Sequence, residues 1–219
     1  MGPMWILACR PWHIKKLFIL AKLYQKKSVD IPMKSTPTPL QGLLILEPNA
    51  APSQDDFHTV TFNQAEFDSL VGNDESGAPY RFVQDNHSLS KRGVLRGLHY
   101  QKAPHAQGKL VRVIQGAIWD VAVDIRPKSL TYGQWFGAEL SASNHKQMWI
   151  PPGFAHGFLT LSDTAQCLYK TTTFFNAASQ DSILWSDPAI NITWPFTNEL
   201  VLSENDLKAH FFTRNFESI

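Results

Sequence analysis

Three residues near the middle of the chain could together perform acid–base chemistry on an anionic substrate. Arg96 and His99 belong to the segment Arg-Gly-Leu-His-Tyr, and Lys109 follows ten residues later. A guanidinium can bind an anion, an imidazole can accept a proton near neutral pH, and an ammonium can stabilise an oxyanion. Charged side chains are seldom buried in strands without a partner. We therefore interpret the three as a candidate active site.

The spacing of Arg96 and His99 requires an irregular strand. Side chains alternate between the two faces of a strand, so residues three positions apart point in opposite directions. Gly97 lies between them and could form a β-bulge that turns both side chains inward. The alternative for His99 is a structural role, as a hydrogen-bonded histidine of the core.

Two further residues could take part in proton transfer. His156 ends the segment Pro-Pro-Gly-Phe-Ala-His, a rigid turn that leads into a strand, and would lie at the rim of a pocket. Tyr169 carries a phenol that could donate a proton. A surface histidine and a core aromatic residue are the respective alternatives.

The elements that must position these residues are mostly strands. Short apolar or alternating segments follow one another, separated by turns rich in Gly, Pro, Asn and Ser, which is typical of a sandwich or barrel. Asn63 and Glu66 have capping-box spacing, which predicts a short helix after Asn63. The predicted strands are 43–46, 81–87, 94–101, 109–114, 117–125, 135–140, 147–150, 157–161 and 166–174.

Residues 118–125 show the clearest alternation. The odd positions are apolar, whereas the even positions include Asp120 and Asp124. One face therefore belongs to the core, and the other faces solvent or the interior of a polar pocket. A small barrel with a ligand in its mouth provides both environments.

Composition excludes several classes of protein. The 219 residues, 43% of them hydrophobic, fit one domain. The net charge of +1 gives no reason to expect nucleic acid as a partner. No apolar run approaches the ~20 residues that span a bilayer, so we predict no membrane span. Cys9 and Cys167 lie too far apart for a disulfide framework, which favours the cytoplasm.

Residues 1–32 differ from the rest of the chain. They carry six basic residues against a single acid, Asp30. One interpretation is a basic amphipathic helix on a membrane surface. The other is a leader that is disordered or not native, with Met33 as the natural start. We predict one folded domain over residues 33–219.

Several longer motifs together resemble the dTDP-4-dehydrorhamnose 3,5-epimerase family, over residues 43–209. They include Phe-Val-Gln-Asp-Asn-His-Ser at 82–88, Val-Leu-Arg-Gly-Leu-His-Tyr-Gln at 94–101 and Ile-Leu-Trp-Ser-Asp-Pro at 183–188. The resemblance implies an all-β cupin-type jelly roll (double-stranded β-helix) with short flanking helices. It also implies a cytoplasmic homodimer that uses no cofactor and no metal.

The resemblance further implies an activity. The enzyme would invert C3 and C5 of dTDP-4-dehydro-6-deoxyglucose through an enolate, giving dTDP-4-dehydrorhamnose. His99 matches the base, Tyr169 the proton donor, Lys109 the residue near the C4 oxygen, and Asp206 the carboxylate that orients the base. The matching substrate-binding residues are Arg96, Gln84, Asn86, His156 and Trp185. Asp206 has an alternative, because its spacing from Ser203 is that of a helix cap.

The chain departs from the family where the nucleotide is expected. An Arg-Gly-x-Phe-x-Glu segment usually precedes the first helix, but Asp55 and Val60 replace its arginine and glutamate. An acid repels a diphosphate, and valine accepts no hydrogen bond. Phe174 and Phe175 also stand where tyrosines are frequent. We predict an intact proton-transfer centre with weakened or altered nucleotide recognition.

Other functions remain open from the sequence. A single-centre epimerase or a ketoisomerase could use the same residues on a different sugar nucleotide. A cupin that binds a sugar nucleotide without turnover is a further alternative. A metal-dependent oxygenase could use His99, His105 and His156, but the sequence lacks a His-x-His pair and an acid shortly after His99.

Overall fold

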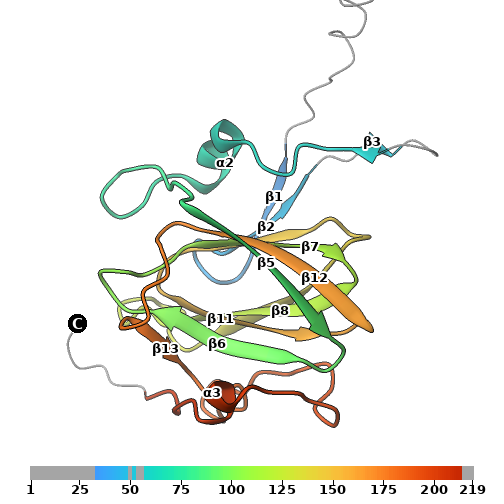
Figure 1. Cartoon of the computed structure of the whole chain (residues 1–219). Helices are drawn as coiled ribbons and strands as arrows, with labels where there is room; N and C mark the ends of the chain where they lie inside the picture. Colours follow the sequence, from blue (N-terminus) through green and yellow to red (C-terminus); the bar gives the residue numbers. More distant parts are fainter. Residues whose placement is uncertain (1–32, 49–50, 53–56, 214–219) are drawn as a thin grey trace, which may run out of the picture. The chain divides into compact units, whose positions relative to one another are not determined.

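The structure of the chain is a computed structural model that describes residues 33–48, 51–52 and 57–213 (Figure 1). Residues 1–32 and Asp55 therefore lie outside the described residues. No helix in the described part is long and apolar enough to cross a membrane. The elements are β1 (Lys34–Pro37), β2 (Leu44–Glu47), β3 (Ala51–Pro52), β4 (Phe57–His58), α2 (Gln64–Val71), β5 (Gln84–Lys91), β6 (Leu95–Gln101), β7 (Lys109–Gln115), β8 (Ala117–Asp124), β9 (Trp135–Ser141), β10 (Gln147–Ile150), β11 (Phe154–Thr160), β12 (Thr164–Thr171), β13 (Gln180–Ser182) and α3 (Glu204–Leu207).

Two antiparallel sheets form two layers of the domain (Figure 1). The six-stranded sheet has the order β1-β2-β10-β7-β12-β5, and the five-stranded sheet has the order β13-β6-β11-β8-β9. Most neighbours in these sheets are distant in sequence, so long connections bring the strands together. The predicted all-β sandwich or barrel is confirmed.

Every predicted strand segment overlaps an observed strand, but some boundaries differ. The segment 81–87 was expected to be a strand throughout, whereas β5 begins at Gln84 and continues to Lys91. The two-residue strands β3 and β4 are not predicted by the sequence pattern, and neither are β1 and β13. β1 has the sequence Lys-Ser-Thr-Pro, and β13 is a three-residue polar strand. Neither offers an alternating apolar pattern.

The largest apolar cluster fills the space between the sheets. Val111, Met148 and Cys167 come from the six-stranded sheet, whereas Ile118 and Phe158 come from the five-stranded sheet. A second cluster covers the other face of the five-stranded sheet with the chain after β13, including Ile183, Ile190 and Trp194. A third cluster packs Phe67 of α2 against Trp149 and Leu46. Each sheet therefore buries apolar residues on both faces.

The two faces of β8 account for its alternating sequence. Val121 and Val123 belong to the second cluster, on the side of the C-terminal chain. Ile118 and Ala122 belong to the cluster between the sheets. Asp120 lies between them and is completely buried. Of the two expected environments for this face, the polar interior is the one observed.

The predicted helix cap is confirmed at α2. The side-chain oxygen of Asn63 accepts hydrogen bonds from the backbone N–H groups of Ala65 and Glu66. These groups have no partner inside the helix, so the cap satisfies them. The helix then presents Phe67, which is 1% exposed, to the six-stranded sheet.

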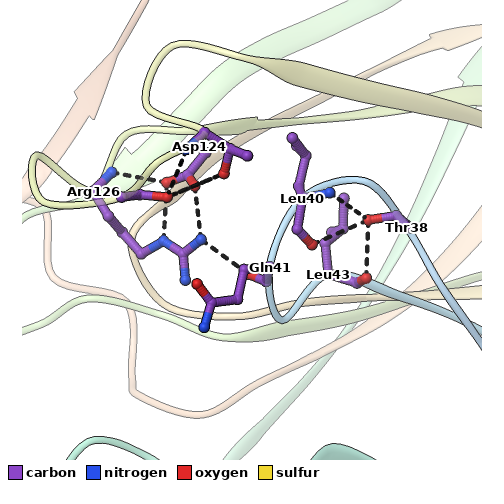
Figure 2. A network of polar contacts seen from close by, with 8 residues as sticks. Thr38, Leu40, Gln41, Leu43, Asp124 and Arg126 are labelled. Carbon is purple, nitrogen blue, oxygen red and sulfur yellow. Dashed lines mark hydrogen bonds and ion pairs between the residues drawn. The ribbon is translucent and has the colours of Figure 1, made fainter.

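Arg126 joins the end of β8 to the turn before β2 (Figure 2). Its guanidinium donates to both oxygens of buried Asp124, at 2.9 and 2.7 Å, and to the carbonyl of Gln41 at 2.9 Å. Burial alone would raise the pKa of Asp124, but hydrogen bonds from Arg126, Ser129 and Thr131 lower it below its usual range. This ion pair holds the end of β8 against the turn before β2, and neither of its residues lines the cavity that contains His99.

Candidate active site

A cavity of about 140 Å³ brings together five of the predicted site residues. Ligand pockets for drug-sized molecules usually span ~300–1,000 Å³, so this cavity suits one ring-sized group rather than a whole nucleotide. The predicted residues on its wall are Arg96, His99, Lys109, His156 and Tyr169. Ser88, Val111, Gly157, Phe158 and Cys167 complete the lining.

The two sheets contribute different chemical groups to the cavity. β6 and β11 of the five-stranded sheet supply Arg96, His99 and His156, whereas β7 and β12 of the six-stranded sheet supply Lys109 and Tyr169. The candidate base and the candidate proton donor therefore approach the cavity from opposite layers. A planar intermediate bound between them could lose a proton on one side and gain one on the other.

The bulge predicted at Gly97 is confirmed. β6 pairs with β11 so that His99 lies opposite His156 and Arg96 lies opposite Phe158, with a register shift between the two pairs. Gly97 has a φ of 123°, which only glycine adopts readily, and an added Cβ would lie 2.5 Å from the Cα of Gly157. The extra residue in β6 allows both Arg96 and His99 to line the cavity.

Asp206 both orients His99 and belongs to a helix cap. His99 Nε2 lies 2.6 Å from Asp206 Oδ1, although the residues are 107 positions apart. Ser203 Oγ accepts from the Asp206 N–H at 3.1 Å and donates to Asp206 Oδ2 at 2.7 Å. The cap uses Oδ2, whereas Oδ1 bonds to the histidine and accepts from the Gly97 N–H at 3.3 Å. The two interpretations of Asp206 are therefore compatible.

The electrostatics of this pair favour an ionised Asp206. Burial alone would raise its pKa, but the hydrogen bonds from His99, Ser203 and the Gly97 N–H lower it below the usual range. A carboxylate can only accept hydrogen bonds, so His99 donates through Nε2. Its other ring nitrogen, Nδ1, is then available as a base.

Lys109 and Tyr169 have the protonation states that the candidate chemistry needs. Burial lowers the pKa of Lys109 to about 8, and the charge of Asp120 partly opposes the shift. Lys109 Nζ also donates to the carbonyl of His99 at 3.4 Å. Burial raises the pKa of Tyr169, with Arg96 acting in the opposite direction. At neutral pH the lysine is therefore cationic and the phenol keeps its proton.

His156 forms a second histidine–carboxylate pair. Its Nε2 lies 2.7 Å from Oδ1 of Asp120, which is completely buried. Burial lowers the pKa of His156, only partly offset by Asp120, so the imidazole is neutral near pH 7. Asp120 was not among the predicted site residues. Its inward position in the alternation of β8 is the signal that could have identified it.

Comparisons with known proteins identify the family of the chain. The family model for dTDP-4-dehydrorhamnose 3,5-epimerase matches residues 37–214. The chain belongs to this family. The recognition made from the motifs is thereby confirmed, and so is the cupin-type fold expected from it.

Individual members of the epimerase family show how close the similarity is. The dTDP-4-dehydrorhamnose 3,5-epimerase of Salmonella typhimurium is 51% identical over 172 residues, covering 78% of this chain and 91% of that protein. The crystal structure of a dTDP-6-deoxy-D-glucose-3,5-epimerase from Legionella pneumophila, in complex with dTDP-4-keto-L-rhamnose, has a TM-score of 0.77 at 44% identity. The structural match covers 82% of this chain and 92% of the Legionella chain. The crystal structure of a 3′-monoepimerase from Streptomyces bikiniensis in complex with dTDP-quinovose has a TM-score of 0.73 at 30% identity. This match covers 80% of this chain and 86% of the Streptomyces chain.

The remaining residues assigned by the epimerase resemblance lie at different distances from the cavity. Gln84 donates to Asn86 at 2.7 Å, and Asn86 donates to the carbonyl of Tyr169 at 3.2 Å. Both are therefore next to the cavity, outside its lining. Trp185 packs against the second cluster, and its carbonyl accepts from Trp194 at 3.0 Å. The structure does not bring Trp185 to the cavity, so its assignment to substrate binding stays a prediction.

The residues considered as metal ligands and the Val60 position of the nucleotide motif can be located in the structure. The described residues contain no group of three or more His, Cys, Asp or Glu side chains that could hold a metal ion. His105, considered as a third nitrogen ligand, is not among the residues that line the cavity. Val60, which replaces a glutamate of the epimerase motif, is 55% exposed.

Proposed function

We propose that this epimerase inverts C3 and C5 of dTDP-4-dehydro-6-deoxyglucose by deprotonation and reprotonation through an enolate. The supporting observation is that His99 and Tyr169 line one cavity from opposite sheets, with Lys109 beside them. The ketone at C4 acidifies the C–H bonds at C3 and C5. Proton removal on one face and proton delivery on the other inverts each centre.

Each group has a separate role in this proposal. His99 Nδ1 removes the proton, and Asp206 steadies the imidazolium through Nε2. The Lys109 ammonium stabilises the enolate oxygen at C4. Tyr169 supplies a proton on the opposite face. Arg96 is exposed beside the cavity and makes no hydrogen bond or ion pair with a described residue, so its guanidinium is available to a phosphate.

Deuterium exchange tests the reaction. The protein is incubated with dTDP-4-dehydro-6-deoxyglucose in D₂O, and deuterium at C3 and C5 is followed by NMR. Exchange at both carbons with inversion is the expected result. Exchange at one carbon indicates a single-centre epimerase or ketoisomerase. Binding without exchange identifies a sugar-nucleotide-binding relative and contradicts the proposal.

Substitution Tyr169→Phe separates proton removal from inversion. The enolate still forms, but the proton can return only from His99 on the original face. We expect deuterium to enter with retained configuration, while inversion slows by about 10²- to 10⁴-fold. Tyr100→Phe is the matched control, because the Tyr100 hydroxyl donates to Asp181 at 3.1 Å, outside the cavity. Inversion by Tyr169→Phe at the wild-type rate would exclude Tyr169 as the donor.

The substitutions at Asp55 and Val60 lead to a prediction about affinity. Loss of a charge-assisted hydrogen bond typically removes ~1.5–3 kcal/mol, so we expect dTDP to bind about 10- to 100-fold more weakly than to the Salmonella relative. Isothermal titration calorimetry with dTDP measures this difference. The double variant Asp55→Arg, Val60→Glu should bind more tightly than the parent. Equal affinity of the two wild-type proteins contradicts the prediction.

We further propose residues 33–219 as a single catalytic domain in a cytoplasmic homodimer. Met33 is 5% exposed and packs in the third cluster, which supports a domain beginning there. Leu89 and Ile114 leave apolar side chains 61% and 42% exposed on strands of the six-stranded sheet, which supports a contact between subunits. Cys167 is a free, buried thiol, in keeping with a reducing compartment.

A further inference from the structure

Asp120 is a buried carboxylate with too few hydrogen bonds to offset the free-energy cost of its burial. It is 0% exposed in the middle of β8, and Oδ1 receives the 2.7 Å hydrogen bond of His156. Oδ2 is also buried and has no hydrogen-bond partner among the described residues. Burying a carboxylate is costly unless a positive charge or a full set of hydrogen bonds compensates for it. An incompletely paired carboxylate therefore needs a further explanation.

The charged and titratable groups around Asp120 explain why a carboxylate is buried there. His156, which bonds to Asp120, lines the same cavity as Lys109. Burial lowers the pKa of Lys109, and the charge of Asp120 partly opposes this shift. Lys109 in turn lowers the pKa of His156, so the three side chains are coupled. The titratable and charged groups that surround Lys109 from the neighbouring strands are Asp120 of β8, His156 of β11, Arg96 and His99 of β6, and Cys167 and Tyr169 of β12. Asp206 of α3 joins this set through its hydrogen bond to His99.

We propose that Asp120 is a positioning residue with two roles: it holds His156 with its proton on Nε2, and its charge keeps the Lys109 ammonium protonated during turnover. This inference rests on the proposed function. It requires Lys109 to act as a cation and His156 to present an unprotonated Nδ1. Nδ1 has no hydrogen bond to a described residue and could accept one from a sugar hydroxyl.

The pairs His99–Asp206 and His156–Asp120 then have different roles in the proposed reaction. His99 is 34% exposed in its side chain, whereas the His156 side chain is 11% exposed and its carboxylate is fully buried. An exposed imidazole can gain and lose protons with solvent during turnover. A buried neutral imidazole acts as a fixed hydrogen-bond acceptor. Asp120 can therefore supply a negative charge behind the cavity wall without making His156 a second base.

The test is the pH dependence of kcat/KM for Asp120→Asn. Asparagine keeps the size of the side chain and can still accept from His156 Nε2, but it removes the charge. Without that charge Lys109 loses its proton at lower pH, so the alkaline limb should move down by about one pH unit or more. The control Asp124→Asn removes the other buried carboxylate of β8, which pairs with Arg126, and should leave the limb in place. An unmoved limb in Asp120→Asn overturns the charge role.

A second measurement uses the unmodified protein and so does not depend on folding of the variant. The ¹⁵N shifts of the His156 ring between pH 6 and 8 should show a protonated Nε2 and an unprotonated Nδ1. The opposite tautomer overturns the inference. Failure of the proposed function would look different, because the wild-type protein would then show no deuterium exchange while the His156 tautomer could still be as inferred.

Discussion

Replacement of His99 by alanine should abolish solvent exchange at both C3 and C5 and lower kcat by about 10²- to 10⁴-fold, the usual contribution of a general base. One imidazole serves both centres in the proposed reaction, so both exchange signals should disappear together. Proton NMR in D₂O at saturating substrate measures them. The fold should persist, because the His99 side chain is 34% exposed and its replacement opens no closed cavity in the core.

A second histidine provides the control for this result. His87 is exposed on β5 and bonds to Gln166 at 2.7 Å. His87→Ala makes the same substitution on the six-stranded sheet, outside the cavity, and deuterium exchange should continue at the wild-type rate. Asp206→Asn should fall between the two, because it keeps His99 but loses the charge that steadies its imidazolium. Exchange at either carbon in His99→Ala would show that another group is the base.

Replacement of Lys109 by methionine should lower kcat by about 10²- to 10³-fold, the loss typical for removal of one oxyanion-stabilising donor. The pH profile of the wild-type protein should carry the same information. Since the pKa of Lys109 is about 8, kcat/KM should fall as pH rises through that value and the ammonium becomes neutral. The alkaline limb near pH 8 should be absent from the residual activity of Lys109→Met.

The same substitution should not destabilise the protein. The pKa of Lys109 is lower in the folded chain than its ordinary value of 10.5, so the unfolded chain binds this proton more tightly. The protonated lysine therefore opposes folding below pH 8, and this penalty disappears as pH rises from about 8 toward 10.5. Methionine removes the penalty, so the melting temperature at pH 7 should stay equal or rise while activity falls.

Lys170→Met is the matched control for both measurements. Lys170 lies on β12, where it forms a 2.9 Å ion pair with Asp85, whose side chain is 57% exposed. Exposed ion pairs contribute roughly 0–1 kcal/mol, so activity should be unchanged and stability nearly so. A parallel loss of stability and activity in Lys109→Met would indicate a structural role for Lys109 instead.

Local sequence patterns were sufficient for the longer strands and for one helix cap. The alternation in residues 118–125 reflects two environments, because Val121 and Val123 pack in an apolar cluster whereas the other face includes the buried carboxylate of Asp120. The Asn63 cap depends only on groups within three residues of one another. β1 and β13 were missed because short polar strands are held by their neighbours in the sheet rather than by their own composition.

The amino-acid sequence by itself thus determined the all-β class, the membership of the epimerase family and the residue types needed for proton transfer. Only the tertiary structure decided how they combine. It joined His99 to Asp206 across 107 residues, showed that a helix cap and an orienting carboxylate can be the same side chain, and paired the buried Asp120 with His156. Local periodicity reports which face of a strand is buried. It contains no information about which distant strand completes the pair, because sheet register and the long connections set those contacts.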